Sequence, residues 1–124
     1  MGTIKRKRAN GKHSGHWISR QRRLAIYLRD NFTCVYCLKN LHDADPRDIS
    51  LDHIVCRIDG GSHHESNLIT SCHRCNSKRA DKSLAQFAGV ETRKMIKRNI
   101  HRKLTRYLKL AQALLAGTTG KENS

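Results

Sequence analysis

Apolar residues follow a helical period near the start of the chain. Leu24, Tyr27 and Leu28 stand at i, i+3 and i+4, which places them on one face of a helix. Ser19 is a residue type that caps helix N-termini. Four arginines fill other positions of this stretch: Arg20, Arg22, Arg23 and Arg29. The pattern predicts a short amphipathic helix within residues 18–30, whose charged face is either solvated or in contact with an acidic partner.

A longer helical stripe follows in the last third of the chain, from Thr92 to Ala116. Apolar residues recur there on one face: Ile96, Ile100, Leu104, Leu108, Ala111 and Leu115. Eight lysines and arginines lie between Arg93 and Lys109, with no acidic residue among them. The pattern predicts one long amphipathic helix that ends at Gly117. Its basic face is either solvated or laid along a polyanion, and the two uses are compatible.

Between these helices the pattern changes to short β-prone runs. The first run spans residues 49–55 and the second spans 68–70. Residues 59–62 are a turn signal, and 39–48, which include the only proline, are typical of a loop. The stretch after the second run has helical character. The predicted order is therefore strand, loop, strand, helix.

Length and composition indicate one domain with extensions. The chain has 124 residues, of which 37% are hydrophobic and six are aromatic, so little is left for an ordinary core. A compact segment of about fifty residues with this composition needs a staple such as a metal. We expect a basic disordered tail at 1–16, a main domain at 17–89, the helical segment 90–116 and a frayed tail at 117–124.

Charge narrows the class of partner. Lysine and arginine number 25 against 10 acidic residues, which gives a formal net charge of +15. Such an excess is typical of proteins that bind nucleic acid; a solubilising role and a membrane surface are weaker interpretations. The chain has no run of about 18 apolar residues, and its N-terminal stretch has no apolar export signal. We therefore expect neither membrane insertion nor export.

Cysteine spacing points to a metal in a reducing compartment, which we take to be the cytoplasm. Four of the five cysteines form two CxxC pairs, Cys34 with Cys37 and Cys72 with Cys75. Paired knuckles of soft ligands are typical of a tetrahedral zinc site. An iron site with four cysteine ligands and a redox-active CxxC are the alternatives. Four thiolates leave no open position for water, so we assign the metal a structural role.

Four other residues near these pairs are not assigned as zinc ligands. His73 lies inside the second pair and is an alternative zinc ligand. Cys56 is expected to be a small buried residue instead of a fifth ligand. His63 and His64, beyond the glycine turn, are expected to face solvent.

The segment around the cysteine pairs resembles a known family. The strings RDNFTCVYC and LDHIVCRIDGGSHHESNLITSCHRCNSKRADK are similar to the zinc-stapled subgroup of HNH endonucleases, over about residues 29–83. The resemblance implies an α+β fold with a small ββα-metal (His-Me finger) core, stapled by a four-cysteine zinc site and flanked by amphipathic helices. It also implies metal-dependent hydrolysis of DNA, with 5′-phosphate and 3′-hydroxyl ends as products.

The resemblance also assigns roles to single residues. His53 is the general base, Asn67 braces the loop between the strands, and Asn76 takes the third motif position, which gives an H-N-N variant. Asp52 and Asn76 are the protein ligands of the catalytic cation. Basic residues around Asn76 are reasonable phosphate clamps for DNA: Arg74, Lys78 and Arg79.

These residue types suit phosphodiester hydrolysis. Neutral imidazole, with an ordinary pKa of about 6.5, accepts a proton from water near neutral pH. A carboxylate and an amide are hard oxygen ligands, which favours Mg²⁺ or Mn²⁺ over Zn²⁺ or Ni²⁺ as the catalytic ion. Consecutive strand residues point to opposite faces, so Asp52 and His53 serve one phosphate only where the strand end relaxes that alternation.

Two other functions stay open. The first is a zinc-stapled module that binds nucleic acid without cutting it. The second is an accessory nuclease, because small HNH proteins of this kind are often encoded by bacteriophages and some act with a packaging terminase. The apolar stripe of the last helix suits such a partner, or a homodimer.

Overall fold

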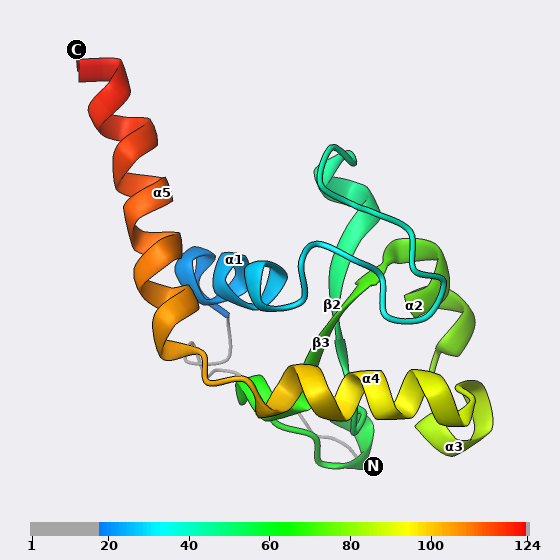
Figure 1. Cartoon of the computed structure of the whole chain (residues 1–124). Coiled ribbons are helices and arrows are strands. Elements are labelled where there is room, and N and C mark those ends of the chain that lie inside the picture. Colours follow the sequence, from blue (N-terminus) through cyan, green and yellow to red (C-terminus); the bar gives the residue numbers. More distant parts are fainter. Residues whose placement is uncertain (1–17, 124) are drawn as a thin grey trace.

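The computed structural model describes residues 18–123 (Figure 1), so the basic segment predicted at 1–16 lies outside the described residues. A two-stranded sheet stands among five helices and three short 3-10 turns in this part of the chain, which confirms the α+β class. In chain order the elements are α1 (Arg20–Arg29), η2 (Pro46–Asp48), β2 (Ile49–His53), η3 (Arg57–Asp59), η4 (Glu65–Asn67), β3 (Leu68–Cys72), α2 (His73–Arg79), α3 (Leu84–Phe87), α4 (Val90–His101) and α5 (Thr105–Asn123).

The predicted N-terminal helix is confirmed as α1. Its N-cap is Ser19, whose side chain accepts a hydrogen bond from the backbone amide of Arg22. Burial is centred on Ala25, Ile26 and Tyr27, and the apolar residues on either side of them are half-buried. The helix therefore presents a wider apolar face to the core than the i, i+3, i+4 pattern alone indicates.

Strands β2 and β3 pair in antiparallel fashion, and α2 follows β3 directly, which confirms the predicted order of strand, loop, strand and helix. The register pairs Leu51 with Thr70 and His53 with Leu68. β3 is buried along its whole length, whereas β2 is buried only in part and ends at His53. In Figure 1 the two strands cross the middle of the molecule, with α4 lying across their lower end.

The C-terminal segment forms two helices, where the sequence predicts one. α4 and α5 are separated by residues 102–104. Ile96 of α4 packs beside Ile69 of the sheet, whereas Leu104 and Ala111 belong to the cluster around α1. One straight apolar stripe does not reach both clusters, so the chain turns between the helices.

α5 continues through Gly117, so the helix end predicted there is wrong. Glycine weakens a helix interior by about 1 kcal/mol relative to alanine, which is not enough to stop a helix of this length. The first half of α5 packs along α1, and the side-chain amide of Gln21 donates to the carbonyl oxygen of Leu108 at 3.1 Å. None of the helices in the described residues is long and apolar enough to cross a membrane.

A buried ion pair joins α1 to the sheet. The Arg29 guanidinium donates to both carboxylate oxygens of Asp30 and to the carbonyl oxygens of Glu65 and Leu68. One carboxylate oxygen of Asp30 accepts from the backbone amide and the hydroxyl of Thr70. The sequence pattern places Arg29 on the charged face of α1; the residue is in fact 1% exposed, because these carboxylate and carbonyl oxygens satisfy its donors inside the protein.

Candidate metal centre and active site

The four paired cysteines converge on one point. Their sulfur atoms all lie within 4.8 Å of one another, and those of Cys37 and Cys72 are 3.9 Å apart. Zinc bound to four thiolates at about 2.3 Å separates the sulfurs by about 3.8 Å, so the cluster fits a tetrahedral zinc ion. Cys72 ends β3 and caps α2, and Cys75 stands in the first turn of that helix. The predicted structural zinc site therefore has its ligands in place.

Electrostatics make a cation necessary for this cluster. Burial raises the pKa of the Cys34 and Cys75 thiols above the ordinary value. Burial acts in the same sense on Cys72, yet hydrogen bonds from Cys75 and from the neighbouring thiols lower its pKa overall. Four thiolates this close, three of them buried, repel one another unless a metal balances their charge, and a coordinating thiol is deprotonated by the metal itself.

Two residues that the sequence placed near the zinc lie outside the cluster. His73 is exposed at the start of α2, and its Nε2 lies 3.5 Å from the Ser77 hydroxyl. Cys56 is half-buried instead of buried, and its sulfur lies 3.9 Å from the carbonyl oxygen of Ala80. Cys56 is therefore not among the cysteines whose sulfurs converge.

His53, the predicted base, is the last residue of β2 and contacts a second histidine. Its Nε2 lies 2.9 Å from Nδ1 of His63, and the ring centroids are 5.0 Å apart. The expectation that His63 faces solvent is wrong, because this contact draws its ring half into the protein. His64 is exposed, as expected, and its ring accepts from the Ser66 amide at the start of η4. No spacing rule in the sequence indicates the pair, because it depends on how the intervening loop closes.

The surroundings of His53 keep its imidazole neutral. Burial is the largest cause; repulsion from the protonated form of His63 and from Arg57 adds to it, so the pKa of His53 falls from 6.5 to about 4. The Asp52 carboxylate acts in the opposite sense and is outweighed. A neutral imidazole at physiological pH has the lone pair that a general base needs.

Asn67 closes the loop that carries His63. Its side-chain oxygen accepts from the Val55 amide at 2.7 Å, and its side-chain nitrogen donates to the carbonyl oxygens of Val55 and Ser62. The chain is packed so tightly here that a Cβ atom at Gly61 would lie 1.6 Å from the carbonyl oxygen of Val55. The loop from the end of β2 to the start of β3 is thus held as one unit by side-chain bonds to its backbone.

Asp52 is buried in an ion pair. Its Oδ2 accepts from Arg79 Nη1 at 2.8 Å and from the hydroxyl of Tyr36, and the Asp52 side chain is 6% exposed. Burial, followed by the charge of Asp52, raises the pKa of Tyr36 above its ordinary value, so the phenol stays a donor. The carboxylate faces away from the His53 ring, as strand alternation requires.

One predicted phosphate contact is contradicted by this ion pair. Arg79 is fully buried, and besides Asp52 it donates to the carbonyl oxygens of His53, Ile54 and Lys82. A guanidinium that is buried in this way does not reach DNA. Two other basic residues of α2 are exposed and stay available for that role: Arg74 and Lys78.

Asn76 lies on the same side of β2 as Asp52. Its side-chain amide donates to the Ser50 hydroxyl at 3.1 Å, and Ser50 is two residues before Asp52 on the strand. The pair does not fit a cation in this arrangement, because the Arg79 guanidinium already neutralises the carboxylate. Among residues 18–123, the cysteine cluster is the one group of three or more metal-ligating side chains that converges.

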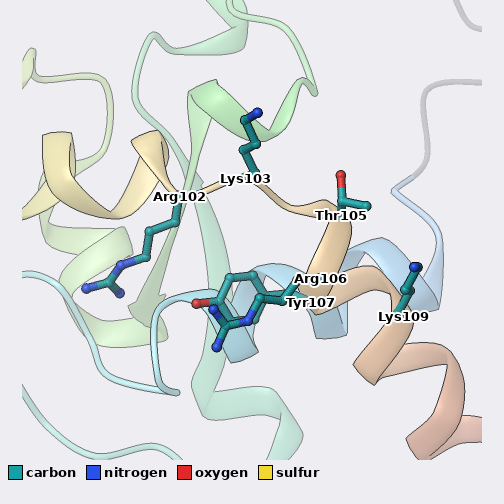
Figure 2. Close-up of a pocket in the computed structure, with 6 residues that line it drawn as sticks. All are labelled: Arg102, Lys103, Thr105, Arg106, Tyr107 and Lys109. Carbon is teal, nitrogen blue, oxygen red and sulfur yellow. The ribbon is translucent and has the colours of Figure 1, made fainter.

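Basic side chains gather where α4 meets α5. A hollow at this corner is lined by Arg102, Lys103, Thr105, Arg106, Tyr107 and Lys109 (Figure 2), and we call these six residues the basic elbow. The Arg106 guanidinium lies 5.3 Å from the centre of the Tyr107 ring, a cation–π distance. A second hollow along α4 is also lined by basic residues, among them Lys94 and Arg98. The surface is suited to a polyanion.

The strand pair and the following helix form a ββα unit with four cysteines positioned to bind a metal and an Asp-His pair at the end of its first strand. In agreement with this, residues 34–82 match the family model described as HNH endonuclease. The match spans less than half of the 124 residues, and the four convergent cysteines within it fit the zinc-stapled subgroup of that family. Neither the curated proteins nor the solved structures that we searched gave a match.

Proposed function

We propose that this protein is a DNA endonuclease in which His53 is the general base. The observation that carries the proposal is the position of His53 at the motif histidine of an HNH segment, with an imidazole that its surroundings keep neutral. Asn67, which holds the adjoining loop, has the bracing role that the family resemblance implies. In this proposal the domain that cuts DNA spans residues 17–89.

The reaction is hydrolysis of one phosphodiester bond. A water oxygen attacks phosphorus while His53 takes one proton from that water, and the bond from phosphorus to the 3′-oxygen breaks. The departing oxygen gains a proton from solvent water, and His53 later returns its proton to solvent, which leaves a 3′-hydroxyl and a 5′-phosphate end. The proton transfer contributes about 10²–10⁴-fold in rate when a side chain is held in position for it.

A divalent cation is part of the proposal on the strength of the family resemblance alone. Mg²⁺ or Mn²⁺ would neutralise charge on the phosphate, with Asp52 and Asn76 as the proposed ligands. Because Asp52 is paired with Arg79, it would have to exchange that guanidinium for the cation. The role of His53 does not depend on where the cation is bound.

DNA contacts are proposed for exposed basic residues on two elements. Arg74 and Lys78 of α2 stand beside Asn76, and the basic elbow offers further cations at the other end of the chain. Contacts of this type bind the phosphate backbone without reading sequence. A cytoplasmic location is proposed for this activity, because cysteines that hold a metal must be kept reduced.

One observation favours a second function, a zinc-stapled module that binds nucleic acid without cutting it. The ion pair of Asp52 with Arg79 closes the proposed cation site and would be a stable end state in a module without activity. An accessory nuclease that needs a terminase subunit or a second copy of the chain is the remaining proposal, and it predicts low activity for the isolated protein.

The deciding experiment is cleavage of supercoiled plasmid by the zinc-loaded protein in Mg²⁺, Mn²⁺, Ni²⁺ or EDTA. The wild type is compared with His53→Ala and with His64→Ala, which removes an exposed histidine from the same loop. We expect cutting that needs a divalent ion, is lost in His53→Ala and is retained in His64→Ala, with DNA binding and zinc unchanged. Tight binding without cutting in every ion would favour the binding module.

A further inference from the structure

We infer that His63 is a positioning residue for His53: Nδ1 of His63 accepts a hydrogen bond from Nε2–H of His53, which leaves Nδ1 of His53 as the basic atom. The inference rests on the proposed role of His53 and adds a residue that the motif letters do not contain. It concerns which of the two imidazole nitrogens carries the proton, and therefore which one meets water.

The contact between the two rings is direct. Nε2 of His53 and Nδ1 of His63 are 2.9 Å apart, an ordinary hydrogen-bond length, and the ring planes are inclined at 49°. No other hydrogen bond to either ring occurs within the described residues 18–123. Each imidazole is thus the one hydrogen-bond partner of the other among these residues. Either His53 donates the proton to His63, or His63 donates it to His53.

Tautomer preference decides between the two arrangements. If His53 donates from Nε2, both rings carry their proton on Nε2, which is the intrinsically favoured tautomer of neutral histidine. If His63 donates from Nδ1, both rings carry it on Nδ1, the disfavoured tautomer. The hydrogen bond is the same length in either case, so the first arrangement is the more stable.

The backbone around His63 is held so that its ring stays in reach. The Arg22 guanidinium donates to the carbonyl oxygen of His63 at 2.9 Å, and the same side chain pairs with Glu65 at 3.3 Å. On the other side, Asn67 donates to the carbonyl oxygen of Ser62. Contacts from α1 and from the end of η4 therefore hold this segment on both sides of His63.

The charges near His63 also suit an acceptor. Its pKa is lowered, first by burial and then by the positive charges of Arg57 and Arg22, so the ring stays neutral and keeps a lone pair on one of its two nitrogens. A protonated His63 would have two N–H groups and no acceptor for His53. The surrounding arginines therefore favour the neutral His63 ring that the inferred hydrogen bond requires, and the tautomer preference gives the direction of that bond.

Two variants test whether His63 acts as a hydrogen-bond acceptor or only fills space. His63→Asn keeps a hydrogen-bond acceptor near the position of Nδ1, whereas His63→Leu has the same branching at Cγ without one. His64→Leu is the matched control, because His64 is the exposed neighbour and touches neither ring. Zinc content and thermal unfolding are measured for each variant, so that loss of fold is recognised.

The first readout is the ¹⁵N spectrum of the imidazoles in the zinc-loaded wild type, with the His53 signals identified by their loss in His53→Ala. We expect His53 in the Nε2–H tautomer in the wild type and in His63→Asn, and a mixture of tautomers in His63→Leu. An Nδ1–H tautomer of His53 in the wild type would overturn the inference, and this result needs no variant to fold and no cleavage activity.

The second readout is plasmid cleavage. Outer partners of a functional histidine are typically worth about 10–100-fold in activity, so kcat should fall by that factor in His63→Leu while KM changes little. His63→Asn should recover most of the loss. Full activity in His63→Leu would overturn the inference. If the wild type cuts no DNA and His53 has the expected tautomer, the proposed nuclease fails while the hydrogen bond stands.

Discussion

Arg79 and Asp52 form an ion pair that solvent hardly reaches. Nη1 of Arg79 lies 2.8 Å from Oδ2 of Asp52, and the two side chains are 1% and 6% exposed. The same guanidinium donates to the carbonyl oxygens of His53 and Ile54, so it also fixes the end of the strand that bears the candidate base. The carboxylate assigned to a cation by family resemblance is thus balanced by a cation of the protein itself.

Removal of Arg79 should destabilise the fold and open Asp52 to metal. Arg79→Ala leaves a buried carboxylate without its partner, which typically costs about 3–5 kcal/mol. We expect a lower free energy of unfolding in urea, and partial recovery on addition of Mg²⁺ or Mn²⁺ because the ion replaces the guanidinium.

Arg74→Ala is the matched control for this experiment, since Arg74 is exposed on the same helix. It should unfold like the wild type with and without the ions. Equal unfolding curves of Arg79→Ala with and without either ion would show that Asp52 is not a cation ligand.

Zinc should be required for folding. The chain should bind one zinc ion, and a strong chelator should unfold the HNH segment, because zinc contributes on the order of 10–16 kcal/mol in small peptides. Cys72→Ser should lose both zinc and helical signal in circular dichroism. Cys56→Ser, at the cysteine outside the cluster, should keep both. Retention of a full zinc equivalent by Cys72→Ser would contradict the four-thiolate site.

Protonation of His53 should occur at a lower pH than that of an ordinary histidine. Because the pKa of His53 is lowered to about 4, the neutral base persists as pH falls from 7 to 5 and is lost only near pH 4. Below about 6.5 the unfolded chain binds a proton that the folded chain does not, so stability falls with decreasing pH in that window. An NMR titration of the His53 ring in zinc-loaded protein tests this directly, with zinc content checked at each pH. A midpoint near 6.5 would contradict the prediction.

The basic elbow should appear in the salt dependence of DNA binding. If about eight phosphates are contacted in all, log K should fall by roughly 7 per decade of salt. Lys103→Ala should reduce that slope by about 1, if the side chain contacts one phosphate. Lys39→Ala removes one exposed charge from the first cysteine loop and should leave the slope unchanged. Equal slopes for the two variants would show that Lys103 of the basic elbow does not contact DNA.

Local patterns predicted those parts of the fold that depend on neighbouring residues. The helix capped by Ser19, the strand-loop-strand-helix order and the convergence of the two CxxC pairs all follow from spacing and turn chemistry. The break between α4 and α5 could not be predicted from the apolar stripe. It arises because the two helices pack against two separate hydrophobic clusters. No glycine or proline within 102–104 marks it in the sequence.

In the candidate site, too, the features set by neighbouring residues were predictable and those set by distant residues were not. The motif letters indicate His53, Asn67 and Asn76, whereas the partners of these residues come from distant segments and have no fixed spacing. Arginine is read from sequence as a surface charge, yet Arg29 and Arg79 are both buried and satisfied by carboxylates and carbonyl oxygens. Whether an arginine meets solvent or the core depends on acceptors that only the folded chain brings together.

The short helix α2 has a consequence for how sequences of this kind vary. Cys75, one of the four clustered cysteines, and Arg79, the partner of Asp52, are four residues apart, about one turn or 6 Å along the axis. A single inserted residue between them would rotate the guanidinium by about 100° and carry it away from the carboxylate while the thiolates stayed on zinc. The interval between the two residues is therefore a length constraint, and a motif written only as residue types does not contain it.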